Sequence, residues 1–155
     1  MKFSLLFIFG ILLLLVKGEK TENFDPDTKY FIFNKLTSRC LKRQLTDNGY
    51  TDYYTITYGK CENDDDSKWY IKDGNIISAA NGHCFSIVNY TRLGAKDCKK
   101  SVIEAIFIQD FIFEDGIICS RLGNCLRDKN GYVGTSKNLD RYNEWVISTS
   151  LPESE

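Results

Sequence analysis

The side chains of this 155-residue chain best suited to covalent or metal chemistry are its six cysteines. Such a set can form disulfides, hold zinc or carry out redox catalysis. No Cys-x-x-Cys pair occurs, and the single histidine, His83, stands beside one cysteine, which argues against a zinc site. The absence of Cys-x-x-Cys argues equally against redox catalysis. The six residues are Cys40, Cys61, Cys84, Cys98, Cys119 and Cys125.

The N-terminus indicates the compartment in which these cysteines reside. Lys2 supplies a positive charge, residues 3–16 are apolar or small, and Gly18 is a small residue at a suitable cleavage position. We therefore expect residues 1–18 to be a signal peptide and the protein to be secreted. The apolar run is shorter than the roughly 20 residues of a membrane-spanning helix, so no span is expected after cleavage. An even number of cysteines in an exported chain predicts disulfides.

The cysteines belong to a repeat with a period of roughly forty residues, which indicates one structural unit used three times around a shared core. A cysteine followed by Leu or Phe comes after a short turn in each repeat, and an aromatic-apolar segment closes each repeat. The three steps are Cys40-Leu41, Cys84-Phe85 and Cys125-Leu126, and the closing aromatic residues are Trp69, Phe111 and Trp145. We expect these three aromatic residues to lie near the pseudo-threefold axis and to supply much of the core.

The repeat also selects among the fifteen connectivities that six cysteines allow. Cys40 with Cys61 and Cys84 with Cys98 occupy matching places in the first two repeats. The third repeat lacks the later cysteine, and a hairpin at Gly123 would instead bring Cys119 to Cys125, within the usual Cα separation of about 4.4–6.8 Å. We predict these three disulfides.

The segments between the cysteines are typical of β-strands. Tyr30–Phe33 is aromatic and β-branched, and residues 51–58 alternate Thr and Tyr around an isoleucine. Asp73-Gly74 and Asp115-Gly116 precede two nearly identical apolar segments, and Asp-Gly favours a tight turn because it tolerates positive φ. Residues 100–108 fit a strand better than a helix. The sequence predicts an all-β fold.

Charge and length limit the remaining possibilities. Without the first 18 residues, 137 residues remain with 18 basic and 21 acidic side chains, a net charge near −3. This argues against nucleic acid as the main partner, since nucleic-acid-binding proteins usually have a basic face. The length fits one domain. We place the domain at residues 29–147, between polar tails at 19–28 and 148–155.

Little in the sequence supports catalysis. His83 has no second histidine to work with, and neither a Gly-x-Ser-x-Gly nor a His-Glu-x-x-His motif occurs. The acidic run Glu62–Asp66 lacks the spaced ligands and glycine of an EF-hand, so we interpret it as a solvated loop. We expect no enzyme activity, cofactor or metal. Asn89-Tyr90-Thr91 is an N-glycosylation sequon, and we expect Asn89 to carry a glycan.

With three Cys-Leu/Phe steps and Asp-Gly turns in register, the chain resembles a ricin B-type lectin domain over roughly residues 29–147. It is most similar to the cysteine-rich domain of the mannose-receptor group. The resemblance includes relics of the family's Gln-x-Trp motif, which are Ser67-Lys68-Trp69, Gln109-Asp110-Phe111 and Asn143-Glu144-Trp145. It implies a disulfide-stapled β-trefoil of three pseudo-repeats that binds carbohydrate.

The sugar-binding positions of the family are replaced in this chain. The position of the hydroxyl-binding Asp holds Lys42, Ser86 and Arg127, and that of the Asn before the Gln-x-Trp motif holds Asp66, Ile108 and Tyr142. The position of the stacking aromatic holds Gly59 and Lys96, without a clear counterpart in the third repeat. Galactose binding in the family's usual manner is therefore not expected.

The cationic replacements favour an anionic glycan through charge-assisted hydrogen bonds. The mannose-receptor relatives bind sulfated sugars in their third lobe with an aromatic residue that falls near Tyr142. The resemblance thus implies a ligand site at Arg127, Asp128, Asn130, Tyr132, Tyr142 and Asn143. The alternative is a secreted trefoil that has lost sugar binding and binds an extracellular protein, as inhibitor, signalling ligand or effector. We expect a monomer in either case.

Overall fold

The computed structural model describes residues 22–44, 54–88, 92–98 and 107–153. The predicted signal peptide, the sequon at Asn89 and most of the 100–108 segment lie outside these residues. In the described ranges the chain forms thirteen strands, two short 3₁₀ turns and no α-helix. None of the helical segments in these ranges has the length and apolar character needed to cross a membrane.

The strands form three successive lobes. The first lobe contains β1 (Tyr30–Asn34), β2 (Cys40–Gln44), β3 (Tyr54–Gly59), the 3₁₀ turn η1 (Asp65–Ser67) and β4 (Lys68–Lys72). The second contains β5 (Asn75–Ser78), β6 (Cys84–Val88), β7 (Arg92–Lys96), β8 (Phe107–Ile108) and β9 (Phe111–Glu114). The third contains β10 (Ile117–Ser120), β11 (Cys125–Asp128), β12 (Val133–Ser136), the 3₁₀ turn η2 (Arg141–Asn143) and β13 (Trp145–Ser148).

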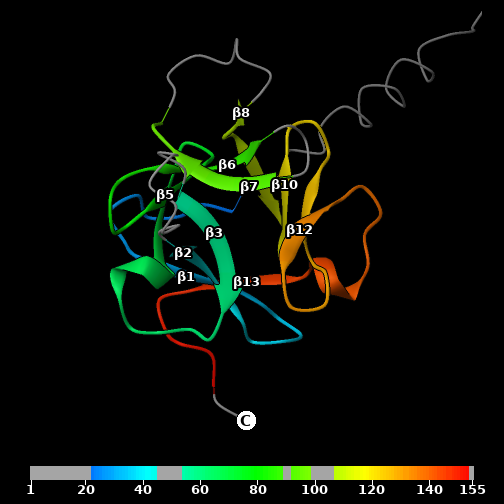
Figure 1. Ribbon diagram of the computed structural model, residues 1–155, viewed down its shortest axis with the longest axis horizontal. Helices are drawn as coiled ribbons and strands as arrows, with labels where there is room; N and C mark the ends of the chain where they lie inside the picture. Colours follow the sequence, from blue (N-terminus) through cyan, green and yellow to red (C-terminus); the bar gives the residue numbers. More distant parts are fainter. Residues whose placement is uncertain (1–21, 45–53, 89–91, 99–106, 154–155) are drawn as a thin grey trace, which may run out of the picture.

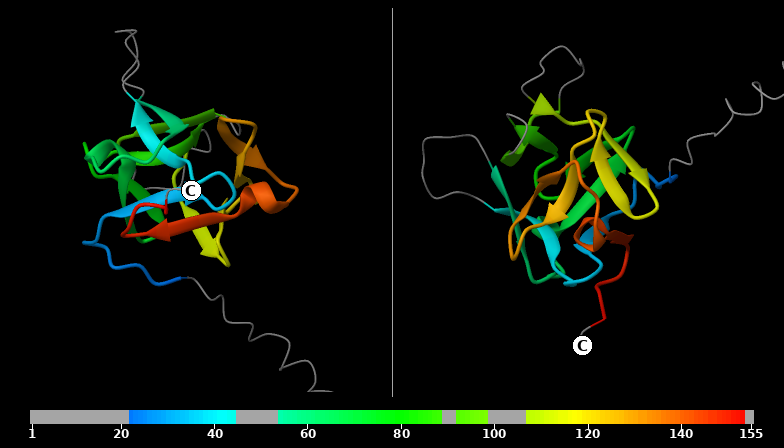
Figure 2. Two further views of the ribbon diagram at one scale, coloured as in Figure 1. Left: turned by 90° about the horizontal axis from the view of Figure 1, so that it is seen from below. Right: turned by 90° about the vertical axis from the view of Figure 1, so that its right-hand side faces the viewer.

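The strands β1, β4, β5, β9, β10 and β13 close into a barrel. Each lobe adds one hairpin beside it (Figures 1 and 2). Antiparallel ladders join β4 to β5, β9 to β10 and β13 to β1. The remaining junctions are the β1–β4 pairing and two bonds, Phe111 N to Gly74 O at 2.8 Å and Trp145 N to Gly116 O at 2.7 Å. The hairpins are β2–β3, β6–β7 and β11–β12.

Both Asp-Gly turns predicted from the sequence are confirmed. Lys72 pairs with Asn75 across the first turn, and Glu114 pairs with Ile117 across the second. The aspartates have φ of 51° and 50° and the glycines 79° and 76°, the left-handed region that Gly adopts readily. A Cβ on Gly116 would lie 3.0 Å from the carbonyl oxygen of Trp145. Gly116 is therefore required both for the turn and for closure of the barrel.

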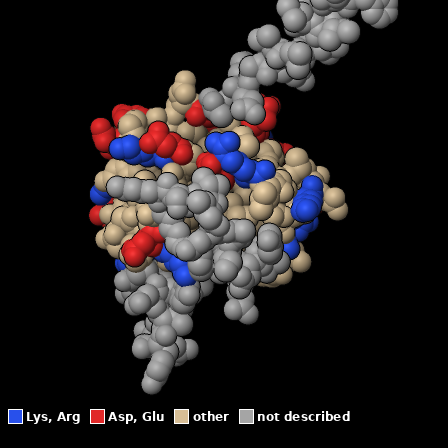
Figure 3. Space-filling model, turned by 90° about the horizontal axis from the view of Figure 1, so that it is seen from above, with Lys and Arg blue, Asp and Glu red and all other residues tan. Residues whose placement is uncertain are grey.

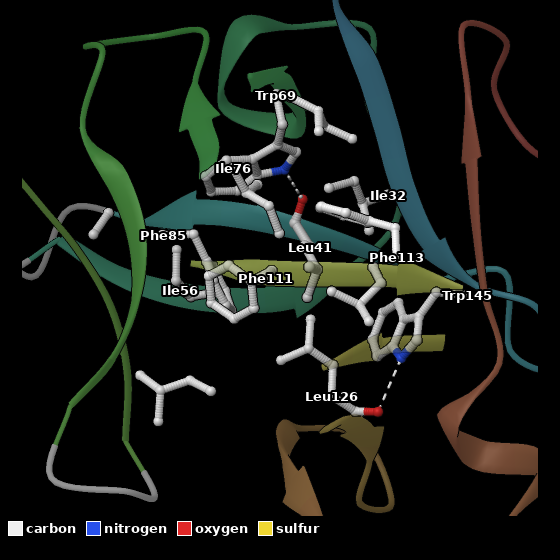
Figure 4. Packing of buried hydrophobic residues seen from close by; sticks show 14 of the residues in the cluster. Ile32, Leu41, Ile56, Trp69, Ile76, Phe85, Phe111, Phe113, Leu126 and Trp145 are labelled. Atoms are coloured by element: carbon white, nitrogen blue, oxygen red, sulfur yellow. Dashed lines mark hydrogen bonds between the residues drawn. The ribbon is translucent and has the colours of Figure 1, made fainter. Parts of the chain in front are cut away.

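One aromatic residue from each repeat enters the shared core, as the sequence predicts (Figure 4). Trp69, Phe111 and Trp145 are at most 3% exposed. Phe85 links two of them, with ring centroids 6.2 Å from Trp69 and 5.3 Å from Phe111. The two indole nitrogens donate to equivalent carbonyls, of Leu41 at 3.0 Å and Leu126 at 3.1 Å. Buried indole N–H groups require such acceptors, so the same arrangement recurs in two lobes.

All three predicted disulfides are confirmed, and none of the six cysteines is free. Cys40–Cys61 and Cys84–Cys98 tie the first strand of a hairpin to the segment just after its second strand. Cys119–Cys125 instead joins two directly paired residues of β10 and β11. Its Cα atoms are 3.9 Å apart, closer than the expected range.

Candidate functional site

Strand register identifies equivalent positions in the three lobes. Cys40, Cys84 and Cys125 pair with Gly59, Lys96 and Ser136 respectively. Ser136 is therefore the third counterpart of the family's stacking position, which the sequence alone did not reveal. None of the three counterparts is aromatic.

In the first lobe, the acidic run is neutralised by neighbouring cations. Lys42, at the family's Asp position, forms an ion pair with Glu62. Arg43 pairs with Asp66 at 2.7 Å, and Lys29 pairs with Asp65 at 2.8 Å. Basic and acidic side chains also lie in neighbouring groups on the face shown in Figure 3. The prediction of a merely solvated acidic loop thus needs refinement, because these carboxylates are held by ion pairs.

In the second lobe, the equivalent position is closed by protein contacts. Ser86 is fully buried, and its hydroxyl accepts a hydrogen bond of 2.9 Å from the Gln109 amide. The same amide donates to the carbonyl of Asp97 at 3.1 Å. Gln109, the one glutamine at the positions that resemble the Gln-x-Trp motif, therefore ties Ser86 to the segment after β7.

In the third lobe, Arg127 lies where the resembling lectins have the hydroxyl-binding Asp. Its guanidinium pairs with the carboxylate of Asp140, which lies in the connection between β12 and η2. Its Nη2 lies 2.7 Å from Asp140 Oδ2, and its Nε lies 3.3 Å from the same oxygen. The hydrogen bond from Arg127 lowers the pKa of the Asp140 carboxyl, and the same bond raises the pKa of Arg127. Asp140 remains 45% exposed, so its carboxylate is still accessible to a ligand.

Asp140 is fixed in place by the 3₁₀ turn that it caps. Its Oδ1 accepts from Tyr142 N at 2.9 Å, and its own N–H donates to Asn143 Oδ1 at 2.9 Å. This reciprocal arrangement is a capping box. Asn143 is fully buried, and its Nδ2 donates to Leu126 O at 2.9 Å. The capped turn therefore positions Tyr142 and Asp140 relative to β11.

Two guanidinium groups lie close to the ring of Tyr142. The Cζ atoms of Arg127 and Arg141 each lie 5.1 Å from the ring centroid, within cation–π range. Arg141 Nη2 also donates to the Tyr142 hydroxyl at 3.2 Å. Among the residues that the structure describes, no carboxylate lies within ion-pair distance of Arg141. Its charge is therefore available to a ligand, whereas that of Arg127 is balanced by Asp140.

A third cation lies on the same face of the β11–β12 hairpin. Side chains alternate along a strand, so Lys129 projects on the same side as Arg127. The Lys129 side chain lies along Gly134, with Cδ 3.0 Å from the place a Cβ would occupy there. Within the described ranges Lys129 has no carboxylate partner. Gly134 thus gives Lys129 the space to lie along the hairpin.

The structure brings together only part of the predicted site. Arg127 and Tyr142 are in contact, but Asp128 is only 3% exposed and Asn143 is fully buried, so both hold structure rather than face solvent. Asn130, with φ of 57°, and Gly131 form the two-residue turn of the hairpin, where Tyr132 is 62% exposed. Lys129, Asp140 and Arg141 were missed, although Asp140 and Asn143 have the spacing of a capping box.

Three hollows on the described surface lie away from these residues. One of about 300 Å³ adjoins Gly116 and Trp145, and one of about 340 Å³ adjoins Phe24 and Arg121. The largest of the three, about 540 Å³, lies between residues 35–38, Lys60 and the C-terminal residues 151–153. The third-lobe cluster is therefore a rim surface of charged and aromatic side chains, separate from these three hollows.

No protein-family model matches the chain, and no curated protein matches it in sequence. Solved structures do match. The β-trefoil lectin of the Vibrio vulnificus hemolysin/cytolysin, with N-acetyl-D-lactosamine bound, is 15% identical with a TM-score of 0.65 over 83% of this chain and 97% of that chain. An earthworm lectin C-terminal domain mutant, in complex with 6'-sialyllactose, is 13% identical with a TM-score of 0.57 over 78% and 98%. The Abrus precatorius agglutinin is 22% identical with a TM-score of 0.60 over 78% and 48%.

These identities are too low to transfer a ligand, but the similarity covers about four fifths of the chain. Together with the closed barrel and three hairpins, it confirms the predicted all-β trefoil. The chain therefore has the β-trefoil fold of the ricin B-type lectins.

Proposed function

We propose that this protein is a secreted, lectin-like module that binds a sulfated or carboxylated glycan at its third lobe. The observation that carries the proposal is the gathering of Arg127 and Arg141 around Tyr142, each with its Cζ 5.1 Å from the ring centroid. Guanidinium groups bind sulfate and carboxylate through paired, charge-assisted hydrogen bonds. A site for an anionic sugar needs such a donor next to groups that bind hydroxyls.

The cluster divides these roles among its members. Arg141 and Lys129 supply positive charge that no described carboxylate neutralises. Asp140 supplies an accessible carboxylate for sugar hydroxyls, and it does so next to Arg127, which occupies the family's Asp position. The carboxylate is thus present in the third lobe but comes from the turn instead of the strand. Tyr142 adds an aromatic edge that replaces the ring missing at Ser136.

Two resemblances support this assignment. The cysteine-rich domain of the mannose-receptor group, which the sequence resembles, binds sulfated sugars in its third lobe. One matched lectin structure is a complex with 6'-sialyllactose, a sugar that carries a carboxylate. Secretion is supported by residues 1–18 and by three disulfides, which are typical of proteins folded in an oxidising compartment.

The test is direct binding of the disulfide-intact chain, residues 19–155, to matched sulfated and unsulfated glycans. We expect binding only to the sulfated member, weakening as salt rises because exposed charges are screened. Arg141→Ala should lower the affinity at least about tenfold, because a hydrogen bond to a charged group contributes about 1.5–3 kcal/mol and tenfold corresponds to about 1.4 kcal/mol. Lys72→Ala removes an exposed cation from the β4–β5 turn and is the matched control. A folded protein that binds no anionic glycan would disprove the proposal.

The second candidate is an extracellular protein partner. Three large side chains on third-lobe loops are exposed: Leu122 at 56%, Leu139 at 58% and Tyr132 at 62%. Exposed apolar groups of this kind are frequent in protein interfaces. If glycans fail to bind, loss of partner binding in Leu139→Asp, with the fold retained, would favour this alternative.

A further inference from the structure

We infer that the third-lobe site continues across the lobe boundary onto Arg39 and Lys60, and that its ligand is a linear anionic polysaccharide several sugars long. This inference rests on the proposed function and extends it from a single sugar to a chain. It is carried by the contact between the third-lobe hairpin and the first-lobe loop, and by the cations that line this contact.

The tip of the β11–β12 hairpin lies next to the loop between β1 and β2 (Figure 1). A Cβ on Gly131 would lie 3.1 Å from Arg39 Nη1, so the guanidinium is packed against the backbone of the hairpin turn. Arg39 Cζ also lies 5.9 Å from the ring of Tyr58. These contacts hold Arg39 at the boundary between the first and third lobes, beside the turn of the β11–β12 hairpin.

Lys60 follows Arg39 along the same surface. Cys40 pairs with Gly59, so the residues just outside this pair, Arg39 and Lys60, lie opposite each other at the end of the β2–β3 ladder. The Cys40–Cys61 disulfide and a 3.4 Å contact from Cys61 Sγ to Ser38 O secure this end of the hairpin. Lys60 lines the 540 Å³ hollow, which also has apolar walls from Leu36 and Leu151.

Arg39 and Lys60 have no carboxylate partner among the described residues, unlike most other cations of the first lobe. Lys35, Lys42 and Arg43 are each paired with a carboxylate. In the described part of the chain, Arg39, Lys60 and Lys129 have none within ion-pair distance. With a net charge near −3, the protein as a whole does not attract polyanions. A polyanion would therefore bind where the unpaired cations Arg39, Lys60 and Lys129 lie.

The spacing of these cations favours a polysaccharide over a single anionic sugar as the ligand. Arg127 lies in β11 and Lys129 just after its end, two residues further on and about 6.6 Å away in extended chain. Arg39 and Lys60 lie on the other side of the hairpin tip. One sugar can contact the Tyr142 end only. A linear polysaccharide with repeated anionic groups can contact both lobes at once, and each added contact becomes intramolecular.

The experiment measures binding of size-defined sulfated oligosaccharides, from a disaccharide to a decasaccharide, to the disulfide-intact chain. We expect affinity to rise with length. The double variant Arg39→Gln/Lys60→Gln should lose about fivefold to tenfold in affinity for the decasaccharide, which corresponds to about 1.0–1.4 kcal/mol for two exposed charge contacts together. It should leave the affinity for the disaccharide unchanged. Arg141→Ala should weaken both ligands. Lys72→Ala is the control for charge alone.

The outcomes separate the two proposals. Equal affinity for all lengths, or a double variant that binds the decasaccharide like the unmodified chain, overturns the two-lobe route and leaves the third-lobe site standing. Failure of every sulfated oligosaccharide to bind overturns both. Equally tight binding of an acidic polypeptide of similar length, such as poly-glutamate, overturns the assignment to polysaccharide. Arg39 packs on Tyr58, so the double variant could lose binding because it loses its fold. A thermal melt of each variant checks that the fold is retained, and the single variant Lys60→Glu tests the route without disturbing Arg39.

Discussion

The Tyr58 hydroxyl donates a hydrogen bond of 3.0 Å to Asp128 Oδ2 and thereby joins the first lobe to the third. Asp128 is only 3% exposed, and its Oδ1 accepts from Gly131 N at 3.1 Å. A buried carboxylate must replace its lost hydration with such donors. Asp128, predicted as a ligand contact, is thus an internal link that holds the hairpin tip against β3.

Replacing Tyr58 with Phe removes one of these donors from the buried carboxylate. We expect the free energy of unfolding to fall by about 1–3 kcal/mol, the cost of leaving a buried polar group unsatisfied. Urea denaturation of the oxidised protein measures the change. Tyr132→Phe, at a position 62% exposed, should change stability by less than about 0.5 kcal/mol. Equal effects from the two variants would contradict the buried link.

The same tyrosine predicts a loss of stability in alkali. Burial raises the pKa of Tyr58 above its ordinary value of about 10. Below pH about 10 both folded and unfolded chains keep the proton, but above it the unfolded chain ionises first. The free energy of unfolding should therefore fall as the pH rises from about 10 towards the folded pKa. Denaturation at a series of pH values should show a shallower fall in Tyr58→Phe, and a parallel fall would argue against this cause.

The turn after the first strand of each lobe provides a matched set of backbone substitutions. Ser38 has φ of 54°, where the equivalent turns of the other lobes place Gly82 at 74° and Gly123 at 78°. Ser38→Gly should raise the free energy of unfolding by about 0.5–1 kcal/mol, because it relieves a left-handed conformation that costs other residues about 1–2 kcal/mol.

Gly82→Ala is the reverse experiment. No atom lies within 4 Å of the place a Cβ would occupy, so the effect comes from the backbone alone. A loss of about 1 kcal/mol is expected in the same assay. If both substitutions destabilise the chain, the strain at Ser38 is not the determining factor.

The three disulfides should differ in their contribution to stability. Cys40–Cys61 closes 21 residues of chain and Cys119–Cys125 closes six. In the chain-entropy model, removing the first pair by alanine substitution costs about 3 kcal/mol and removing the last about 2 kcal/mol. Guanidinium denaturation of the two double variants tests this order, and a larger loss from the Cys119–Cys125 pair would contradict it.

Local signals explain why much of the fold was predictable. The Asp-Gly turns, the Cys-Leu steps and the closing aromatic residues each act within a few residues, and together they revealed the repeat, the trefoil and the disulfides. The Asn130-Gly131 pair is an equally local hairpin signal. These two residues form the turn of the β11–β12 hairpin, and a ligand contact at Asn130 stays a prediction.

The site was harder to predict because it depends on register and burial. Whether Asp128 faces inward depends on which side of β11 meets Tyr58, and no local pattern fixes that. Arg141 and Lys129 become significant only when the ion pairs of their neighbours are known. Phe24 is a similar case. It precedes the predicted domain, yet its ring packs edge-on against Tyr30 at 5.6 Å and Phe113 at 5.2 Å.

The ladder between β1 and β13 has a consequence for biosynthesis. It joins Phe31 to Ser148, so the barrel cannot close until nearly the whole chain has left the ribosome. Each disulfide, by contrast, links residues of one lobe separated by at most 21 positions. In an oxidising compartment, each disulfide can therefore form once its own lobe has emerged, before the last strand arrives to complete the barrel.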